Sequence, residues 1–310
     1  MSIAYLFPGQ GAQTPGFLHR LPGHPAVSAT LDEAGAVLGM EVKILDTAAA
    51  LESTTAVQLC VLIAGVAVSR ALAWEGVIVD AAAGLSVGAF GAAVACGALR
   101  FADALPLVKL RGECMQQAYP HGYGMAAIVG LDEQQVAAIV ENLGGDAAEL
   151  YVAAINAPTQ IVVSGADRAL DAAIETARRN GARRAERMAV TVPSHCPLLD
   201  GVALRLEAAM AAIDMRDPQR PYVSNRRARA VSDAQGVRDD LIHNVSHAVR
   251  WHDSVTLLRE LSVRLFIEPP PGQVLSRLAE QSFPEARAVA VEDARLDSIL
   301  LLAERERTTP

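Results

Sequence analysis

The sequence predicts an α/β protein that carries a ferredoxin-like insert, and three observations support this prediction. Residues 3–7 form an apolar run that stops at Pro-Gly, as a buried strand does. A second apolar run, over residues 76–84, leads through a tight turn straight into a small-residue helix, which is an α/β unit. Residues 122–192 then alternate between strand-like and helical segments.

Length and composition fit one large globular domain that contains an insert. The 310 residues are 51% hydrophobic and 20% charged, which supplies a core and excludes a disordered chain. The formal net charge is −8, so we do not expect nucleic-acid binding as the main activity, because neutralising phosphates needs a strongly basic surface. Four cysteines without a CxxC pair indicate neither a zinc site nor a redox site.

The start of the chain and its apolar stretches favour a cytoplasmic protein that does not associate with membranes. The first ten residues have no basic start and no long apolar core, so we expect no secretory signal there. A nearly all-apolar helix is predicted over residues 54–74, which indicates burial on most sides. We expect charged residues and glycine to interrupt every apolar stretch before it reaches the length of a membrane span.

The insert is predicted from the order of its segments. Strand-like runs read MAAIVG, YVAAINAP, QIVVSGA and RRAERMAVTV, and each of the two helices between them ends at a glycine. The resulting order, β-α-β-β-α-β, is that of a ferredoxin-like unit. We therefore predict a core formed by residues 1–121 and 193–310, with an inserted subdomain over residues 122–192.

The strongest chemical motif is Gly84-Leu85-Ser86-Val87-Gly88, a GxSxG pattern between a predicted strand and a predicted helix. Glycine is needed on both sides, because a nucleophile elbow brings the neighbouring strand and helix too close for side chains. The turn presents the Ser86 hydroxyl over a helix N-terminus, where the Val87 N–H is free to stabilise an oxyanion. The alternative is an ordinary glycine-rich turn without catalytic function.

A serine nucleophile needs a base, and His195 is the best placed of the seven histidines. It follows the last strand of the insert in the Pro-bounded loop VPSHCPLL, although a structural histidine stays an open alternative. His243 and His247 have i, i+4 spacing, but no glutamate completes an HExxH motif. We therefore expect a solvated helix face there and no metal site.

The glycine-rich loop after the first strand, PGQGAQTPG, does not fit a phosphate-binding loop. Phe17 and Leu18 stand where a Walker A motif has lysine and a hydroxyl residue, and Thr14 breaks the dinucleotide-binding pattern. The loop could instead supply a second oxyanion donor, the backbone amide of Gln10.

Arg111 lies on the apolar face of a helix predicted over residues 104–118. Burying an arginine is costly unless an anion meets it, and the guanidinium fork matches a carboxylate with two hydrogen bonds. Arg111 could therefore bind a substrate carboxylate. Equally, it could reach the surface or pair with a remote acidic residue.

Six ordered segments resemble the malonyl-CoA:acyl-carrier-protein transacylase family. They extend over roughly residues 3–280 and read FPGQGAQ, the GxSxG elbow, RGECMQQA, NAPTQIVVSG, VPSHCPLL and EPPPGQVL. The resemblance implies an α/β-hydrolase-like core with a ferredoxin-like insert. It implies Ser86 as nucleophile, His195 as base, the Gln10 and Val87 amides as oxyanion hole, and Arg111 as the ligand of the malonate carboxylate.

The resemblance implies further site residues and no cofactor. Asn156 and Gln160 match a segment that lines the family's site. The family's histidine is oriented by a backbone carbonyl near a glutamine that precedes a tryptophan, and here Arg250 precedes Trp251. We therefore expect Arg250 to present its carbonyl to His195, with a side chain free to reach a phosphate or the malonyl carboxylate. Neither a metal nor a redox cofactor is implied.

Two departures from the family's usual elbow, Leu85 for histidine and Ala89 for glutamate, resemble the epsilon subunit of malonate decarboxylase. That branch implies transfer to the decarboxylase's own carrier subunit, whose thiol arm is a phosphoribosyl-dephospho-CoA group. The alternatives are the same transfer in fatty-acid or polyketide synthesis, a serine esterase or thioesterase, and a non-catalytic carrier-docking subunit. Arg111 disfavours the esterase, and the pair of Ser86 and His195 disfavours the docking subunit.

An acidic carrier would need a local basic patch to dock on this acidic chain. The first candidate is an arginine-rich stretch of the insert, and the second is a loop of the core, although chance clustering of arginines is the alternative. The stretches consist of Arg178, Arg179, Arg183, Arg184 and Arg187, and of Arg226, Arg227 and Arg229.

Overall fold

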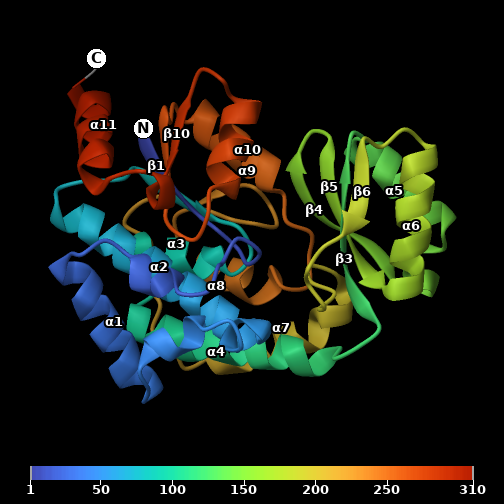
Figure 1. The fold of residues 1–310 in the computed structure, drawn as a ribbon, viewed down its shortest axis with the longest axis horizontal. Helices are drawn as coiled ribbons and strands as arrows, with labels where there is room; N and C mark the ends of the chain where they lie inside the picture. Colours follow the sequence, from blue (N-terminus) through green and yellow to red (C-terminus); the bar gives the residue numbers. More distant parts are fainter. Residues whose placement is uncertain (1, 309–310) are drawn as a thin grey trace.

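Two β-sheets organise the computed structural model, which describes residues 2–308 (Figure 1). The larger sheet has the strand order β10-β9-β1-β2-β7-β8, and every neighbouring pair is parallel except β7 with β8. The predicted parallel-sheet core is therefore confirmed. Its strands are β1 (Ile3–Phe7), β2 (Ala81–Gly84), β7 (Tyr222–Val223), β8 (Ala230–Val231), β9 (Leu265–Glu268) and β10 (Arg287–Ala290).

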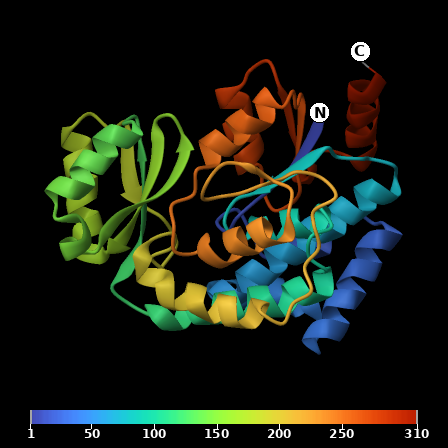
Figure 2. The ribbon, with the colours of Figure 1, turned by 180° about the vertical axis from the view of Figure 1, so that it is seen from behind.

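Helices cover both faces of the larger sheet (Figures 1 and 2). Alternate side chains of the central strand β1 enter two separate hydrophobic clusters, because successive residues of a strand point to opposite faces. The helices are α1 (Pro25–Leu38), α2 (Thr54–Trp74), α3 (Gly88–Ala95), α4 (Phe101–Ala118), α7 (Asp200–Met210), α8 (Ala234–His243), α9 (Trp251–Glu260), α10 (Val274–Ser282) and α11 (Leu296–Thr308). Short 3-10 turns occupy Phe17–Arg20, Val42–Asp46, Ala50–Glu52, Gly145–Ala148, Pro197–Leu199 and Val291–Asp293.

The second sheet is antiparallel, has the order β4-β5-β3-β6 and lies to one side of the core (Figures 1 and 2). Two helices pack on it with their own hydrophobic cluster, which confirms the predicted order β-α-β-β-α-β. The limits of the inserted subdomain stay a prediction. The elements are β3 (Tyr123–Val129), α5 (Glu133–Asn142), β4 (Leu150–Ala157), β5 (Gln160–Ala166), α6 (Asp167–Arg179) and β6 (Arg184–Arg187).

The last strand of this sheet is shorter than the sequence predicts. The apolar alternation continues to Val192, but β6 ends at Arg187. Met188 and Val190 leave the sheet to line a cavity beside the core, so their apolar character reflects that cavity and not sheet pairing.

Backbone hydrogen bonds join the two sheets. The Val249 carbonyl accepts from the Ile155 N–H at 2.8 Å, and the Val249 N–H donates to the Ala153 carbonyl at 2.9 Å. Strand β4 therefore pairs in parallel with the segment that precedes α9, and this seam fixes the insert against the core.

The helix α2 corrects one expectation from the sequence. It is long and apolar enough to cross a membrane by length and composition. Charged residues and glycine therefore do not interrupt this stretch before it reaches the length of a membrane span. However, 89% of its most apolar window is buried inside the structure, among α1, α3 and α4. We interpret it as a core helix, whose all-round hydrophobicity matches burial on all sides.

Candidate active site

The turn between β2 and α3 is a strained elbow centred on Ser86. Ser86 has φ 56°, in the left-handed region that residues other than glycine rarely adopt. A Cβ atom on Gly84 would lie 2.1 Å from the Gly88 carbonyl oxygen, and one on Gly88 would lie 2.3 Å from the Phe7 carbonyl oxygen. Both glycines are therefore required by backbone contacts, as expected for the motif.

Two backbone amides lie beside the elbow. Val87 is the N-cap of α3, so its N–H belongs to the start of the helix, where amides lack partners within the helix. Gln10 follows β1 and lines the same cavity as Ser86. Neither N–H donates a hydrogen bond within residues 2–308. Both amides are therefore available to an oxygen that gains negative charge.

His195 is buried, and its Nδ1 lies 2.5 Å from the Asn244 carbonyl oxygen. A carbonyl only accepts, so Nδ1 carries the proton and Nε2 holds the free lone pair that a general base needs. Burial first, and the charge of Arg111 second, lower the pKa of His195 to about 4, although the carbonyl groups of Asn244 and His247 act in the opposite direction. The imidazole is therefore neutral at neutral pH.

Arg111 is completely buried beside the nucleophile. Its Nη2 donates to Ser86 Oγ at 3.1 Å, and its Nη1 donates to Gln58 Oε1 at 2.7 Å. Burial lowers the pKa of Arg111 to about 9, so the guanidinium stays charged at neutral pH. Within residues 2–308, Arg111 has no carboxylate partner, and its Nε has no hydrogen-bond partner.

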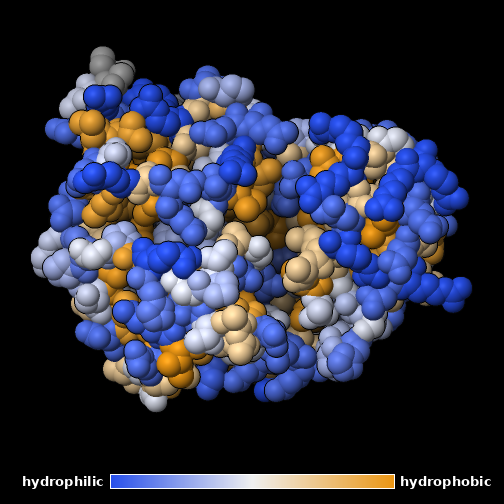
Figure 3. Space-filling view, viewed as in Figure 1, coloured by the Kyte–Doolittle hydropathy of each residue, from blue (hydrophilic) through white to orange (hydrophobic). Residues whose placement is uncertain are grey.

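A cavity of about 70 Å³ between the core and the insert is lined by Gln10, Ser86 and His195, and Arg111 lies behind Ser86, whose Oγ it contacts. Figure 3 shows apolar side chains gathered in a hollow between the two parts of the molecule. Backbone and side chains from both parts form the cavity wall, so the site depends on the seam between them. The lining residues are Gly9, Gln10, Leu85, Ser86, Met115, Met125, Ala154, Asn156, Val162, Met188, Val190, Ser194, His195 and Val249.

Of the two site residues expected from the insert, Asn156 lies at the cavity and Gln160 does not. Asn156 lines the cavity, and its Oδ1 is buried without a hydrogen-bond partner. Gln160 begins β5 and is not among the lining residues. Only Asn156 is therefore in a position to contact a group bound in the cavity.

The expectation for Arg250 is wrong. The carbonyl oxygen on His195 Nδ1 belongs to Asn244, not to Arg250. The Arg250 guanidinium donates two hydrogen bonds to Glu133, at 3.0 and 3.1 Å, and also pairs with Asp253. Arg250 does not line the cavity, because its side chain points to the start of α5 in the insert.

Sequence reasoning missed three residues that the structure brings to the site. Gln58 is fully buried, and a lone amide in the apolar helix α2 was a signal that could have found it. Asn244 is also fully buried, and its Oδ1 lies 3.5 Å from Arg111 Nη2. Asn225 accepts a hydrogen bond from the Ser86 N–H at 2.8 Å, and nothing in its local sequence indicates that contact.

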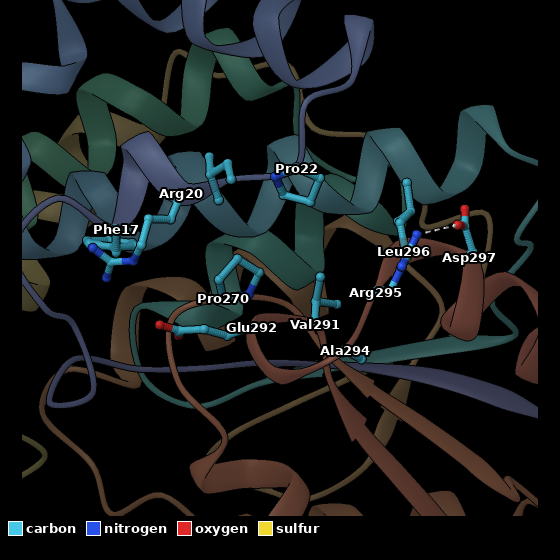
Figure 4. Close-up of a pocket in the computed structure, with 11 residues that line it drawn as sticks. Phe17, Arg20, Pro22, Pro270, Val291, Glu292, Ala294, Arg295, Leu296 and Asp297 are labelled. Carbon is cyan, nitrogen blue, oxygen red and sulfur yellow. Dashed lines mark ion pairs between the residues drawn. The ribbon is translucent and has the colours of Figure 1, made fainter.

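A larger pocket of about 540 Å³ lies elsewhere and contains none of the expected site residues (Figure 4). It opens between the turn Phe17–Arg20 and the segment that carries Arg295, which pairs with Asp297. No group of three or more His, Cys, Asp or Glu side chains in the described part of the chain is arranged to hold a metal ion. His243 pairs instead with Asp239.

Comparison with known proteins agrees with this geometry. The model of the acyl transferase domain family matches residues 4–300. The chain is 35% identical to the malonyl CoA-acyl carrier protein transacylase of Bacillus subtilis (strain 168), over 94% of this chain and 93% of that protein.

Solved structures give the same result. The malonyl CoA-acyl carrier protein transacylase of Coxiella burnetii superposes with a TM-score of 0.92 at 32% identity, over 98% of each chain. A malonyl-transacylase solved in complex with its type II PKS acyl-carrier protein superposes with a TM-score of 0.91 at 32% identity, over 98% of this chain and 99% of that one. The chain is thus an acyltransferase and belongs to the malonyl-CoA:acyl-carrier-protein transacylase family.

Proposed function

We propose that the chain transfers a malonyl group from malonyl-CoA to the thiol of an acyl carrier protein, through a malonyl ester of Ser86. One observation carries the proposal: the buried charge of Arg111 lies 3.1 Å from Ser86 Oγ and meets no carboxylate within residues 2–308. An unpaired buried charge is costly, and the free carboxylate of a malonyl group would pair with it. An acetyl group has no such carboxylate.

Acylation of Ser86 follows from the positions of the cavity groups. Nε2 of His195 accepts the Ser86 proton as Oγ forms a bond to the thioester carbonyl carbon. The carbonyl oxygen becomes an oxyanion, which the amides of Gln10 and Val87 stabilise. The carbon–sulfur bond then breaks, and the CoA thiolate leaves with the proton held by His195. The carrier thiol reverses these steps and takes the malonyl group from Ser86.

Substrate binding also frees the nucleophile. Ser86 Oγ accepts a hydrogen bond from Arg111 Nη2 and makes no hydrogen bond to His195 in the described structure. A malonyl carboxylate on the guanidinium replaces this contact, because a bidentate carboxylate is a stronger acceptor than a hydroxyl. Oγ is then free to turn toward Nε2.

The carrier that we favour is an acyl carrier protein of fatty-acid or polyketide synthesis. The relatives and solved structures given above are named as transacylases that act with acyl carrier proteins, and one was solved with such a carrier. They give no support to the interpretation of the chain as a malonate decarboxylase subunit. We also propose that the enzyme works in the cytoplasm and that residues 122–192 form an inserted subdomain.

The direct test offers radiolabelled malonyl-CoA to the protein, first alone and then with each class of carrier. We expect an acid-stable label on the peptide that contains Ser86, absent in Ser86→Ala, and its transfer to an acyl carrier protein. Rapid hydrolysis of neutral esters without labelling from malonyl-CoA would support an esterase instead. Transfer only to a phosphoribosyl-dephospho-CoA carrier would restore the decarboxylase interpretation.

A further inference from the structure

Asn225 holds the backbone of the elbow on the N-terminal side of Ser86. Its Oδ1 accepts from the Ser86 N–H at 2.8 Å, and its Nδ2 donates to the Gly84 carbonyl at 2.7 Å. The residue is 3% exposed, so water does not compete for these bonds. Only a side-chain amide both accepts and donates with this span, so aspartate cannot make the second bond.

Asn225 is itself fixed by a buried network. Its N–H donates to Asp240 Oδ2 at 3.0 Å, and its carbonyl accepts from the Arg250 N–H at 2.9 Å. Asp240 is 3% exposed and also accepts from the Tyr222 hydroxyl at 2.6 Å and from the Arg226 N–H at 3.2 Å. The backbone of Asn225 is therefore fixed on both sides, by a buried carboxylate that accepts three hydrogen bonds and by the Arg250 N–H.

These contacts act on the strained residue of the site. A left-handed serine persists only where its surroundings fix it, and the two bonds from Asn225 fix the Ser86 N–H, which adjoins the φ angle, and the Gly84 carbonyl at the end of β2. They also engage the Ser86 N–H, which leaves the next amide, that of Val87, as the free donor at the start of α3. The orientation of Oγ and the direction of the Val87 N–H depend on the same clamp.

We propose that Asn225 is a positioning residue for malonyl transfer: it holds Ser86 in the left-handed conformation that aims Oγ and the Val87 amide at the same thioester. This proposal rests on the proposed function. A positioning role affects the reaction of a bound substrate, whereas the binding of malonyl-CoA depends on Arg111 and the cavity walls. Replacing Asn225 should therefore lower the rate constant of acylation and leave its half-saturating concentration nearly unchanged.

The test compares Asn225→Asp and Asn225→Ser with Asn142→Asp, an exposed asparagine at the end of α5. Single-turnover labelling from malonyl-CoA gives the acylation rate constant and the half-saturating concentration, at a temperature where circular dichroism shows each variant folded. We expect both Asn225 variants to lose about 100-fold in rate constant, as for a misplaced reacting group, with less than a threefold change in half-saturation. Asn142→Asp should match the parent.

A fluorophosphonate probe separates this proposal from the proposed function, because it labels Ser86 without a malonyl group. Both Asn225 variants should react with the probe more slowly than the parent, even if malonyl-CoA proves not to be the substrate. Equal probe rates in the parent and the folded Asn225 variants would overturn the positioning role. So would a defect confined to half-saturation by malonyl-CoA. If one variant fails to fold, the other decides.

Discussion

Arg111 combines two properties that rarely occur together, complete burial and the absence of an acidic partner within the described chain. Gln58 and the Ser86 hydroxyl accept hydrogen bonds from the two terminal nitrogens without neutralising the charge, and Nε has no partner among the described residues. The charge of the site is therefore uncompensated, which favours an anionic acyl group over a neutral one.

Replacing Arg111 should change the choice of acyl group. We expect Arg111→Ala to lower kcat/KM for malonyl-CoA by about 30-fold to several thousand-fold, which corresponds to about 2–5 kcal/mol for a lost buried charge partner. The value for acetyl-CoA should change far less. Measuring both substrates checks this, and an unchanged malonyl to acetyl ratio would show that Arg111 has only a structural role.

The lowered pKa of His195 predicts an unusual pH profile for acylation. The base must be neutral, and its pKa of about 4 keeps it so across the physiological range. The rate of self-acylation by malonyl-CoA should therefore stay nearly constant from pH 8 to about pH 5 and fall near pH 4. A half-maximal rate near pH 6.5, the ordinary pKa of histidine, would contradict the burial argument.

The same shift predicts a loss of stability in acid. Between pH 6.5 and 4 the unfolded chain binds a proton at His195 that the folded chain does not, so this contribution is present above pH 6.5 and lost as the pH falls toward 4. The difference between pH 6.5 and 5 is of order 2 kcal/mol. Urea unfolding at both pH values should show a smaller pH dependence in His195→Phe than in the parent.

At the scale of the residue, the catalytic side chains could be predicted from the sequence, but the carbonyl that orients His195 could not: it belongs to Asn244 and not to Arg250. Ser86, His195 and Arg111 stand in recognisable segments; the structure places Ser86 and His195 on one cavity and the Arg111 guanidinium 3.1 Å from Ser86 Oγ. Which carbonyl in the loop before α9 reaches His195 depends on how that loop turns, and no residue type encodes a carbonyl. That contact therefore follows only from the three-dimensional path of the loop.

At the scale of the element, the start of α3 depends on the absence of a side chain at Gly88. A Cβ there would lie 2.3 Å from one backbone carbonyl, that of Phe7, and 2.6 Å from the next, that of Pro8. Backbone atoms at the end of the central strand cannot move aside as a flexible side chain can, because β1 is buried and paired on both edges.

Gly88→Ala should therefore prevent stable folding or lower the melting temperature severely. Gly201→Ala is the matched control, because it also lies near the start of a helix and a Cβ there meets nothing within 4 Å. The control should be neutral or stabilised by about 0.5–1 kcal/mol, the helix preference of alanine over glycine. Similar melting temperatures for the two variants would disprove the contact argument.

The elements themselves were largely predictable, for physical reasons. Residues 3–7 and 56–69 are buried on every side, so their composition alone indicates a central strand and a core helix. The end of β6 was not predictable, because Met188 and Val190 line a cavity. Apolar residues are typical both of a cavity wall and of a buried sheet face, so the sequence pattern does not distinguish the two. The clamp of Asn225 on Ser86 joins residues 139 positions apart, beyond the reach of any local pattern.

At the scale of the whole molecule, a shared hydrophobic cluster and backbone hydrogen bonds attach the insert to the core, together with one ion pair near the surface within residues 2–308. Arg250 and Glu133 form that ion pair, and their side chains are 36% and 42% exposed. Solvent-exposed ion pairs contribute roughly 0–1 kcal/mol, so the seam at Val249 accounts for more of the attachment.

Arg250→Gln and Glu133→Gln should consequently keep most of the self-acylation rate. The double variant should resemble either single variant, because removing one partner already removes the pair. Labelling rates from malonyl-CoA check this prediction. A loss as deep as that of His195→Ala would mean that the guanidinium takes part in the reaction.

The ion pairs of the insert reduce the number of arginines that are candidates for docking an acidic carrier. Arg187 already pairs with Asp167 and Asp171, and Arg184 pairs with Glu186, so these charges are partly neutralised. Arg178, Arg179 and Arg183 are exposed and form no ion pair within residues 2–308. Arg178 and Arg179 donate hydrogen bonds to Ala185 and Thr176, so Arg183 is the candidate of that stretch that we test first.

Arg183→Glu should raise KM for the carrier and leave self-acylation unchanged, and added salt should reduce the difference. Arg205→Glu, an exposed arginine on α7, controls for the change in net charge. Equal carrier KM values for the two variants would move the docking site away from the insert.

The burial of α2 has a consequence for how the protein is made in the cell. α4, one of the helices that cover α2, is translated later, and at about 5–20 residues per second its synthesis follows after several seconds. During that interval the nascent chain displays a segment that meets the length and composition of a membrane anchor. We therefore expect the ribosome-bound chain to engage chaperones at residues 54–74, and truncation before α4 to give an aggregating or membrane-bound fragment.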